Sequence, residues 1–265
     1  MIKKIAISGL AILVIAFLIL HLYIYPSPPK FPIEDRTKPI LIAHAGGAYK
    51  GKIYTNSLEA ITSSLKNGYE FIEIDLQILS DHKLGGIHDL EQFNSITGYG
   101  EIPDNLSSKQ IRDRKIYGEL HPVLAQDINH IFNKNSAYLV TDKIEDPALL
   151  EHEIHLDKKR MLVETFSYTS YVNHVRYGYD YPMLCIGGEE ELEHYWPLFI
   201  TNKVRIITFP ADKIIDSADK LQELIKKDVA IFAFSTDDRD LILKYGGNTV
   251  SGFYTDSTTY RDLYK

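Results

Sequence analysis

Residues 71–77 read FIEIDLQ, the pattern of a β-strand that carries two acidic residues. Side chains of a β-strand alternate between two faces, so Glu73 and Asp75 project from one face, together with Phe71. Ile72 and Ile74 project from the opposite face. Burying two like charges on an otherwise apolar strand is costly unless a cation or a basic group neutralises them. Because hard divalent cations bind carboxylate oxygens, this strand indicates a metal site. The alternative is a buried ion pair with a lysine or arginine from a neighbouring strand.

The chain after Lys38 alternates short apolar strands with amphipathic or polar helical stretches. Eight repeats of strand and helix are the pattern of a closed parallel (β/α)8 TIM barrel, which commonly uses about 250 residues. An open doubly wound sheet gives similar local signals, but the number of strands favours the closed barrel. We expect the strands at residues 40–44, 70–76, 137–142, 161–166, 182–186, 204–209, 229–235 and 251–255.

The first helix and a long insertion flank the second strand. Asn56 is expected to cap the helix, Glu59 completes a capping box, and Gly68 ends it. An interval of about 90–122 then breaks the alternation with glycines, prolines and polar residues. We interpret it as a small insertion after the second strand region, beside the active face, where loops carry function in this architecture. Residues 31–265 are thus expected to form one barrel domain.

The composition argues against nucleic-acid binding and against internal disulfide bonds. The net charge of −7 and the sparse clustering of basic residues argue against nucleic-acid binding, which requires a concentrated basic face. The single cysteine, Cys185, rules out an internal disulfide framework. It lies in an apolar run at 183–186, and we expect it to be a small buried core residue.

The N-terminal segment is membrane-like. Lys3 and Lys4 precede the uncharged stretch Ile5–Tyr25, which is long enough for a helix to cross a bilayer. A cleaved signal peptide has a shorter apolar core of about 7–15 residues and a small-residue cleavage site. We therefore expect residues 1–30 to form a single-pass anchor and a proline-rich spacer; a buried core helix is the alternative. By the positive-inside rule, the two lysines predict that the rest of the chain lies on the periplasmic or extracellular side.

Four short motifs point to one family. They are IAHAGG at 42–47, NSLEA at 56–60, FIEID at 71–75 and IHD at 87–89. Together they resemble the glycerophosphodiester phosphodiesterases, whose members carry His-Arg-Gly on the first strand, Glu-Asn-Thr at a helix start, Glu-Leu-Asp on the second strand and a His-Asp pair soon after. Weaker matches at 141–143, 233–235 and 252–256 extend the resemblance over nearly everything after the N-terminal segment.

The resemblance implies hydrolysis of a small-molecule or lipid-derived phosphodiester with one divalent cation, Ca²⁺ or Mg²⁺. On this basis Glu73, Asp75 and Asp142 are assigned to the metal, and His44 and His88 to general acid and base catalysis. A cation that holds nonbridging phosphate oxygens stabilises the transition state, and two histidines can exchange the roles of proton acceptor and donor.

The register of the third strand leaves an ambiguity. Asp142 and Lys143 are adjacent, so on a regular strand only one of them points inward unless a bulge intervenes. If Lys143 faces the substrate, Thr141 takes the place of the acid. We prefer Asp142, because the metal needs a third charged ligand more than the phosphate needs a second cation.

Three more residues, with Lys143, are assigned to the substrate region. Glu164, which ends the fourth strand, is expected to support the metal ligands or to pair with Lys143. Phe234 and Tyr254, near the ends of strands seven and eight, can pack on the carbon skeleton of a substrate or simply fill the core. Seven other histidines are expected at the surface: His82, His121, His130, His152, His155, His174 and His194.

Two departures from the family pattern indicate a divergent branch with a different head group. Ala45 stands where the family usually has an arginine suited to bidentate phosphate contact, and Thr55 stands where a glutamate precedes Asn56. Two alternatives to hydrolysis of a glycerophosphodiester therefore stay open. One is a relative of phosphatidylinositol-specific phospholipase C that forms a cyclic phosphate. The other, favoured by Ala45, is a catalytically weak module that binds surface polymers containing glycerol phosphate.

Overall fold

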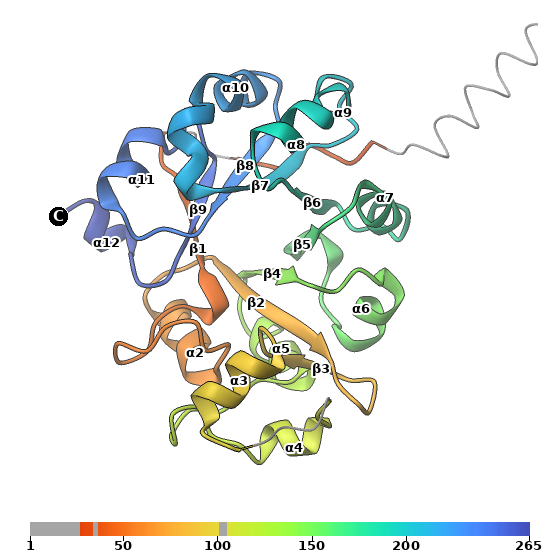
Figure 1. Ribbon diagram of the computed structural model, residues 1–265, viewed down its shortest axis with the longest axis vertical. Coiled ribbons are helices and arrows are strands. Elements are labelled where there is room, and N and C mark those ends of the chain that lie inside the picture. The colour runs from red at the N-terminus through yellow and green to blue at the C-terminus, as the bar shows by residue number, and fades with distance from the viewer. Residues whose placement is uncertain (1–26, 34–36, 101–104) are drawn as a thin grey trace, which may run out of the picture.

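The computed structural model describes residues 27–33, 37–100 and 105–265. Eight parallel strands follow one another in the order β1-β9-β8-β7-β6-β5-β4-β2, and pairing of β1 with β2 closes the barrel (Figure 1). The closed barrel is thus confirmed over an open sheet. One short antiparallel strand, β3, continues the sheet beyond β2. The strands are β1 Ile40–Ala43, β2 Phe71–Ile78, β3 Leu84–Gly86, β4 Tyr138–Asp142, β5 Met161–Thr165, β6 Tyr181–Cys185, β7 Ile206–Pro210, β8 Ala230–Phe234 and β9 Gly252–Thr255.

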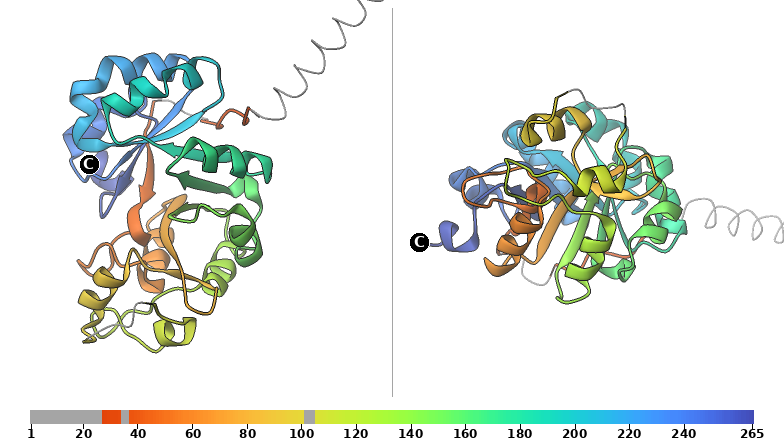
Figure 2. Two further views of the ribbon diagram at one scale, coloured as in Figure 1. Left: turned by 45° about the vertical axis from the view of Figure 1, so that its right-hand side comes forward. Right: turned by 90° about the horizontal axis from the view of Figure 1, so that it is seen from below.

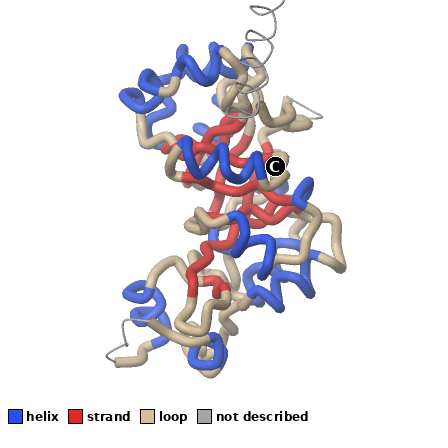
Figure 3. Tube along the Cα trace, turned by 90° about the vertical axis from the view of Figure 1, so that its right-hand side faces the viewer, coloured by secondary structure: helices blue, strands red, loops and turns tan. Residues whose placement is uncertain are grey.

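Helices surround the strands on the outside of the barrel (Figures 2 and 3). Three short 3-10 turns, η1 His44–Gly46, η2 Lys158–Arg160 and η3 Ala211–Lys213, join some of the elements. The helices are α2 Leu58–Lys66, α3 Leu90–Thr97, α4 Ser108–Arg112, α5 Ala125–Phe132, α6 Pro147–Glu153, α7 Tyr168–Arg176, α8 Glu189–His194, α9 Trp196–Ile200, α10 Ile214–Lys226, α11 Arg239–Tyr245 and α12 Tyr260–Leu263.

The alternation of side chains along each strand separates two apolar cores. On β2, Ile72 and Ile74 belong to the large core between the strands and the helices, whereas Phe71 belongs to a smaller core inside the barrel. This arrangement follows the period of two residues that the sequence of β2 predicts. The inside core fills the half of the barrel near the starts of the strands, which leaves the inward positions further along β2 to Glu73 and Asp75.

The segment 27–33 closes the barrel at the N-terminal ends of its strands. Phe31 is only 2% exposed. Lys30 forms an ion pair of 2.6 Å with Asp228, two residues before the start of β8. The ring of Phe31 packs against three rings of the inside core, with centroid distances of 6.2 Å to Phe71, 5.0 Å to Tyr181 and 5.6 Å to Phe232.

The insertion has a core of its own. It begins before the expected residue 90, because β2 continues to Ile78 and turns back as β3. Helices α3 and α4 lie together beyond this hairpin, at the lower end of the molecule in Figure 1. The buried residues of this core are Leu79, Ile87, Phe93, Leu106, Ile111, Ile116, Leu120 and Leu124.

Two further expectations concern the exposure of His174 and the membrane anchor. His174, expected at the surface, is fully buried on α7, where its Nδ1 lies 3.0 Å from the carbonyl oxygen of Ser170. That expectation is wrong, because α7 turns this side chain toward the barrel. The expected anchor Ile5–Tyr25 lies outside the described residues. Among the described helices, none combines the length and the apolar character needed to cross a bilayer.

Candidate active site

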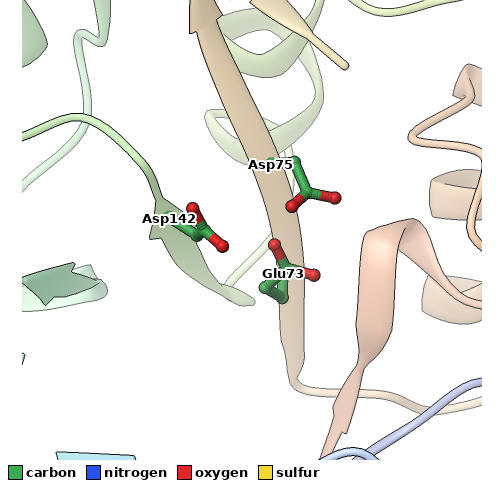
Figure 4. Close-up of side chains that lie close together, drawn as sticks. All are labelled: Glu73, Asp75 and Asp142. Carbon is green, nitrogen blue, oxygen red and sulfur yellow. The ribbon is translucent and has the colours of Figure 1, made fainter. Parts of the chain in front are cut away.

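Three carboxylates meet at the C-terminal ends of two neighbouring strands. Glu73 and Asp75 lie on β2, and Asp142 ends β4 directly opposite Asp75. One oxygen of each side chain lies within 4.8 Å of the others (Figure 4). We call these three residues the acidic cluster. Oε1 of Glu73 and Oδ1 of Asp142 are buried and have no hydrogen-bond partner among the described residues. An all-oxygen donor set with unpaired buried oxygens fits a hard divalent cation such as Ca²⁺ or Mg²⁺.

The electrostatics of the acidic cluster are unfavourable without a cation. Burial, followed by the charges of Asp75 and Asp142, raises the pKa of Glu73 well above its ordinary value. Burial and the neighbouring acids Glu164 and Asp75 raise the pKa of Asp142 to about 8. Both shifts express the cost of holding like charges together away from water. A bound divalent cation reverses this cost, because it stabilises the ionised carboxylates.

The backbone of Ala45 and the side-chain amide of Asn56 hold two of the acids in place. The N–H of Ala45 donates to Oε2 of Glu73 at 2.6 Å. Asn56 donates through Nδ2 to Oδ2 of Asp75 at 2.8 Å and accepts from the backbone N–H of Asp75 at 3.0 Å. The expected capping role of Asn56 is wrong, since Ser57 caps α2 instead. This leaves the Asn56 amide to orient Asp75.

The ambiguity of the third strand has a simple geometric answer. Lys143 has a φ of 64°, so the chain leaves the alternation of β4 directly after Asp142. Its Nζ lies 3.6 Å from Oδ1 of Asp75 and donates to the carbonyl oxygen of His88 at 2.8 Å. Asp142 and Lys143 therefore both reach the site. Thr141 instead pairs in register with Ile74, whose side chain faces the helices.

A buried ion pair with a lysine or arginine was the alternative to a metal site for Glu73 and Asp75, and it holds for Asp75 only. Lys143 pairs with Asp75, but no described lysine or arginine approaches within 4.0 Å of Glu73. One cation for three carboxylates leaves the acidic cluster with an excess of negative charge. A divalent cation would balance that excess.

Each of the two expected histidines has a carboxylate partner. Nδ1 of His44 lies 2.8 Å from Oδ1 of Asp256, and Nδ1 of His88 lies 2.5 Å from Oδ2 of Asp89. A carboxylate only accepts, so each Nδ1 carries the shared hydrogen, and Nε2 is left to take or give a proton. Hydrogen bonds from the backbone of Gln92 and from His88 hold the pKa of Asp89 below its ordinary value. Asp89 therefore stays ionised beside the imidazole.

A cavity of about 190 Å³ opens above the acidic cluster between the two histidines. The ring of Tyr54 lies beside both imidazoles, with centroid distances of 4.8 Å to His44 and 5.1 Å to His88. Phe166, half exposed, and Phe234 line the same cavity. Phe234 also packs against the core inside the barrel, so both roles considered for it from the sequence stay open.

Glu164 and Tyr254 form the floor of the cavity. Both are buried, and the hydroxyl of Tyr254 donates to Oε1 of Glu164. Thr208 approaches the other carboxylate oxygen at 3.4 Å. Glu164 therefore pairs with tyrosine and not with Lys143. Burial raises the pKa of Glu164 to about 7.

Sequence reasoning missed three residues of the cavity. Cys185, expected in the core, is half-buried and lines the cavity at the end of β6, and burial raises the pKa of its thiol to about 11. Its place directly at a strand end, like that of Phe166 just after β5, is a signal that could have found it. Tyr54 gives no such signal, because it lies far from any strand end in a loop.

Backbone strain concentrates around the acidic cluster. Nine non-glycine residues of the described chain have positive φ, and four of them surround the site: Ala45, Tyr54, Asn56 and Lys143. A left-handed conformation costs a side-chain-bearing residue roughly 1–2 kcal/mol. Such strain is retained where the surrounding structure imposes it, typically at functional sites.

The comparisons with known proteins agree with this geometry. The sequence model of the Glycerophosphoryl diester phosphodiesterase family matches residues 44–194, more than half of the chain. No curated protein matches the sequence.

Solved structures share the fold at low sequence identity. A glycerophosphodiester phosphodiesterase of Thermotoga maritima is 18% identical with a TM-score of 0.64, over 82% of this chain and 94% of that one. One from Parabacteroides distasonis is 17% identical with a TM-score of 0.63, over 83% and 94%. A phosphodiesterase of Oleispira antarctica, in complex with the product sn-glycerol-3-phosphate, is 16% identical with a TM-score of 0.66, over 83% and 93%.

Proposed function

Since this chain belongs to the glycerophosphoryl diester phosphodiesterase family, we propose that it hydrolyses a glycerophosphodiester with the help of one divalent cation, Ca²⁺ or Mg²⁺. Glu73, Asp75 and Asp142 would hold the cation. The observation that carries the proposal is their convergence within 4.8 Å, with buried oxygens that lack a partner. Membership of the family makes the chain a phosphoric diester hydrolase.

The two histidines divide the proton transfers of the reaction. When bound, the cation neutralises charge on the nonbridging oxygens of the phosphate. The attacking hydroxyl, from water or from the substrate's own glycerol, loses its proton to one imidazole as the bond to phosphorus forms. The leaving alcohol takes a proton from the other imidazole as its bond breaks. Asp256 and Asp89, paired with the Nδ1 atoms of His44 and His88, orient the rings and stabilise the imidazolium form.

The binding-module alternative has one observation in its favour. Ala45 brings no guanidinium to the phosphate, so the site lacks a bidentate clamp at this position. A measurement of substrate turnover distinguishes a hydrolase from a module that only binds the substrate.

The test is hydrolysis by the purified full-length chain in detergent. Glycerophosphocholine and glycerophosphoethanolamine are incubated with Ca²⁺, Mg²⁺ or EDTA, and phosphorus NMR follows the products. We expect glycerol 3-phosphate only with an ion, and loss of turnover in His44→Ala with the fold retained. Accumulation of a cyclic phosphate would favour the phospholipase C alternative. No turnover with any ion, in a chain that circular dichroism shows to be folded, would favour the binding module.

We also propose that Ile5–Tyr25 anchors the chain in a membrane, with the barrel on the periplasmic or extracellular side. Support comes from the length and apolar character of this stretch and from Lys3 and Lys4. The first described segment, 27–33, packs at the N-terminal ends of the strands, opposite the acidic cluster. An anchor would thus hold the barrel by its closed end. Release of the full-length chain from membranes by alkaline carbonate alone would contradict the proposal.

A further inference from the structure

We propose that the hydroxyl of Tyr54 binds a nonbridging oxygen of the phosphodiester, in place of the arginine that the family usually has at position 45. The inference rests on the proposed function of the same site. It assigns substrate contact to a residue that lies outside the family motifs. It also explains how the site can bind a phosphate although Ala45 offers no side-chain hydrogen bond to it.

The contact of Tyr54 with both imidazoles is the first support. A phosphorus atom that is attacked with help from one histidine, and that releases its alcohol with help from the other, must lie between them. Tyr54 borders that interval, with its ring 4.8 Å from the ring of His44 and 5.1 Å from that of His88. It lines the cavity together with the acidic cluster.

The availability of its hydroxyl is the second support. Within residues 27–33, 37–100 and 105–265, Tyr54 forms its one hydrogen bond through its carbonyl oxygen and none through its hydroxyl, and its side chain lines the cavity. Other tyrosine hydroxyls of the barrel are engaged. Tyr254 donates to Glu164, Tyr69 to the carbonyl oxygen of Thr258 at 2.6 Å, and Tyr260 to that of Pro39 at 3.0 Å. The Tyr54 donor is left for a ligand.

The backbone holds Tyr54 in this position. Its φ of 58° is unfavourable for a bulky residue. Gln92 of α3 donates to its carbonyl oxygen at 2.8 Å, and two residues later Asn56 is fixed to Asp75. The loop is thus tied both to the insertion and to the acidic cluster, which places the aromatic ring reproducibly in the cavity.

The relation to position 45 is also direct. The N–H of Asn56 donates to the carbonyl oxygen of Ala45 at 2.9 Å, so the Tyr54 loop lies beside the residue that replaces the arginine. None of the residues lining the cavity is a lysine or arginine, and the amine of Lys143 is committed to Asp75 and to the His88 carbonyl. A phenol remains protonated at neutral pH and supplies a neutral donor where the guanidinium is missing.

The test compares Tyr54→Phe with Tyr49→Phe in the full-length chain. Tyr49 lies in the same loop but packs against the core of the insertion, so it is a matched control. Two readouts are used: kcat and KM for glycerophosphocholine with Mg²⁺, and the affinity for sn-glycerol 3-phosphate with Mg²⁺ by calorimetry. One hydrogen bond to a charged oxygen predicts a loss of about 10- to 100-fold in kcat/KM and in product affinity for Tyr54→Phe. Tyr49→Phe should stay within about twofold of the unmodified chain.

The two readouts separate failure of the inference from failure of the proposed function. If the unmodified chain binds the product but does not turn over, calorimetry alone still decides the role of Tyr54. Values for Tyr54→Phe within about twofold of the unmodified chain, in a protein with an unchanged melting temperature, would overturn the inference. So would an equal loss in Tyr49→Phe, because the effect would then belong to the loop and not to the hydroxyl.

Discussion

The two ends of strand β2 differ sharply over a few residues. At its start, Phe71 stacks on Tyr138 with a centroid distance of 4.6 Å and packs against the buried ring of Phe31. Two and four residues further along the same inward face lie Glu73 and Asp75, within the acidic cluster. The closed end of the barrel is apolar, and its aromatic rings are packed against one another. The open end gathers like charges, unpaired oxygens and strained backbone.

The difference separates stability from function within one strand. Apolar contacts at the closed end contribute to folding whatever the ligand. The acidic cluster, without a cation, works against folding, because it holds like charges together away from water. Changes at the open end should therefore alter activity and ion binding, whereas changes at the closed end should alter stability alone.

The largest expected effect is the loss of activity in Glu73→Gln. The amide keeps the shape and can still accept from the N–H of Ala45, but it removes one charge from the proposed cation site. We expect kcat/KM to fall by about 1,000-fold or more, since a cation contributes several kcal/mol of transition-state stabilisation. In EDTA the melting temperature of Glu73→Gln should lie above that of the unmodified chain, because one of the buried like charges has been removed.

The control for this prediction is Glu223→Gln. Glu223 is an exposed acid on α10 that pairs with Lys227, and its neutralisation should leave both activity and melting temperature nearly unchanged. Full activity in Glu73→Gln would remove Glu73 from the cation site.

The second expected effect concerns the closed end. Phe31→Ala should lower the free energy of unfolding by about 3–4 kcal/mol, the usual loss for a buried phenylalanine. The kcat per folded molecule should stay within about twofold, because the cavity lies at the other end of the strands. Urea denaturation and assays below the transition measure the two quantities.

An exposed apolar residue provides the comparison. Ile215 is 61% exposed on α10, and Ile215→Ala should cost less than about 0.5 kcal/mol. A large fall in activity of folded Phe31→Ala would show that the two ends of the barrel are coupled.

The same contrast explains what the sequence could predict. The strands of the barrel and the convergence of Glu73, Asp75 and Asp142 follow from hydrophobic alternation and from strand ends, which are local properties of the chain. The positions of Lys143 and Tyr54 do not, because each depends on a left-handed backbone conformation that its residue type does not signal.

Contacts between distant segments were the other source of error. The burial of His174 depends on how α7 packs, and the hairpin of β2 with β3 depends on pairing that extends beyond the barrel. Ser57, and not Asn56, caps helix α2, because the side chain of Asn56 is bonded to Asp75 instead. In each case a tertiary contact overrides the local pattern.

The smallest expected effect is a pH dependence of stability that a cation abolishes. In the metal-free protein the pKa of Glu73 is raised, that of Asp142 is about 8 and that of Glu164 about 7, all above the values of about 4 in the unfolded chain. The folded state therefore binds these protons more tightly, and the resulting stability is present below about pH 4 and is lost as pH rises through 7 to 8.

Melting temperatures between pH 5 and 9, with EDTA and with excess Ca²⁺ or Mg²⁺, measure this dependence. We expect the temperature to fall with rising pH in EDTA and to be nearly flat with the ion, which adds about 2.7 kcal/mol at 100 times its Kd. Glu73→Gln should flatten the EDTA curve, whereas Phe31→Ala should lower it evenly at every pH. Equal slopes with and without the ion would mean that no cation binds the acidic cluster, and the contrast between the two ends of the barrel would then concern packing alone.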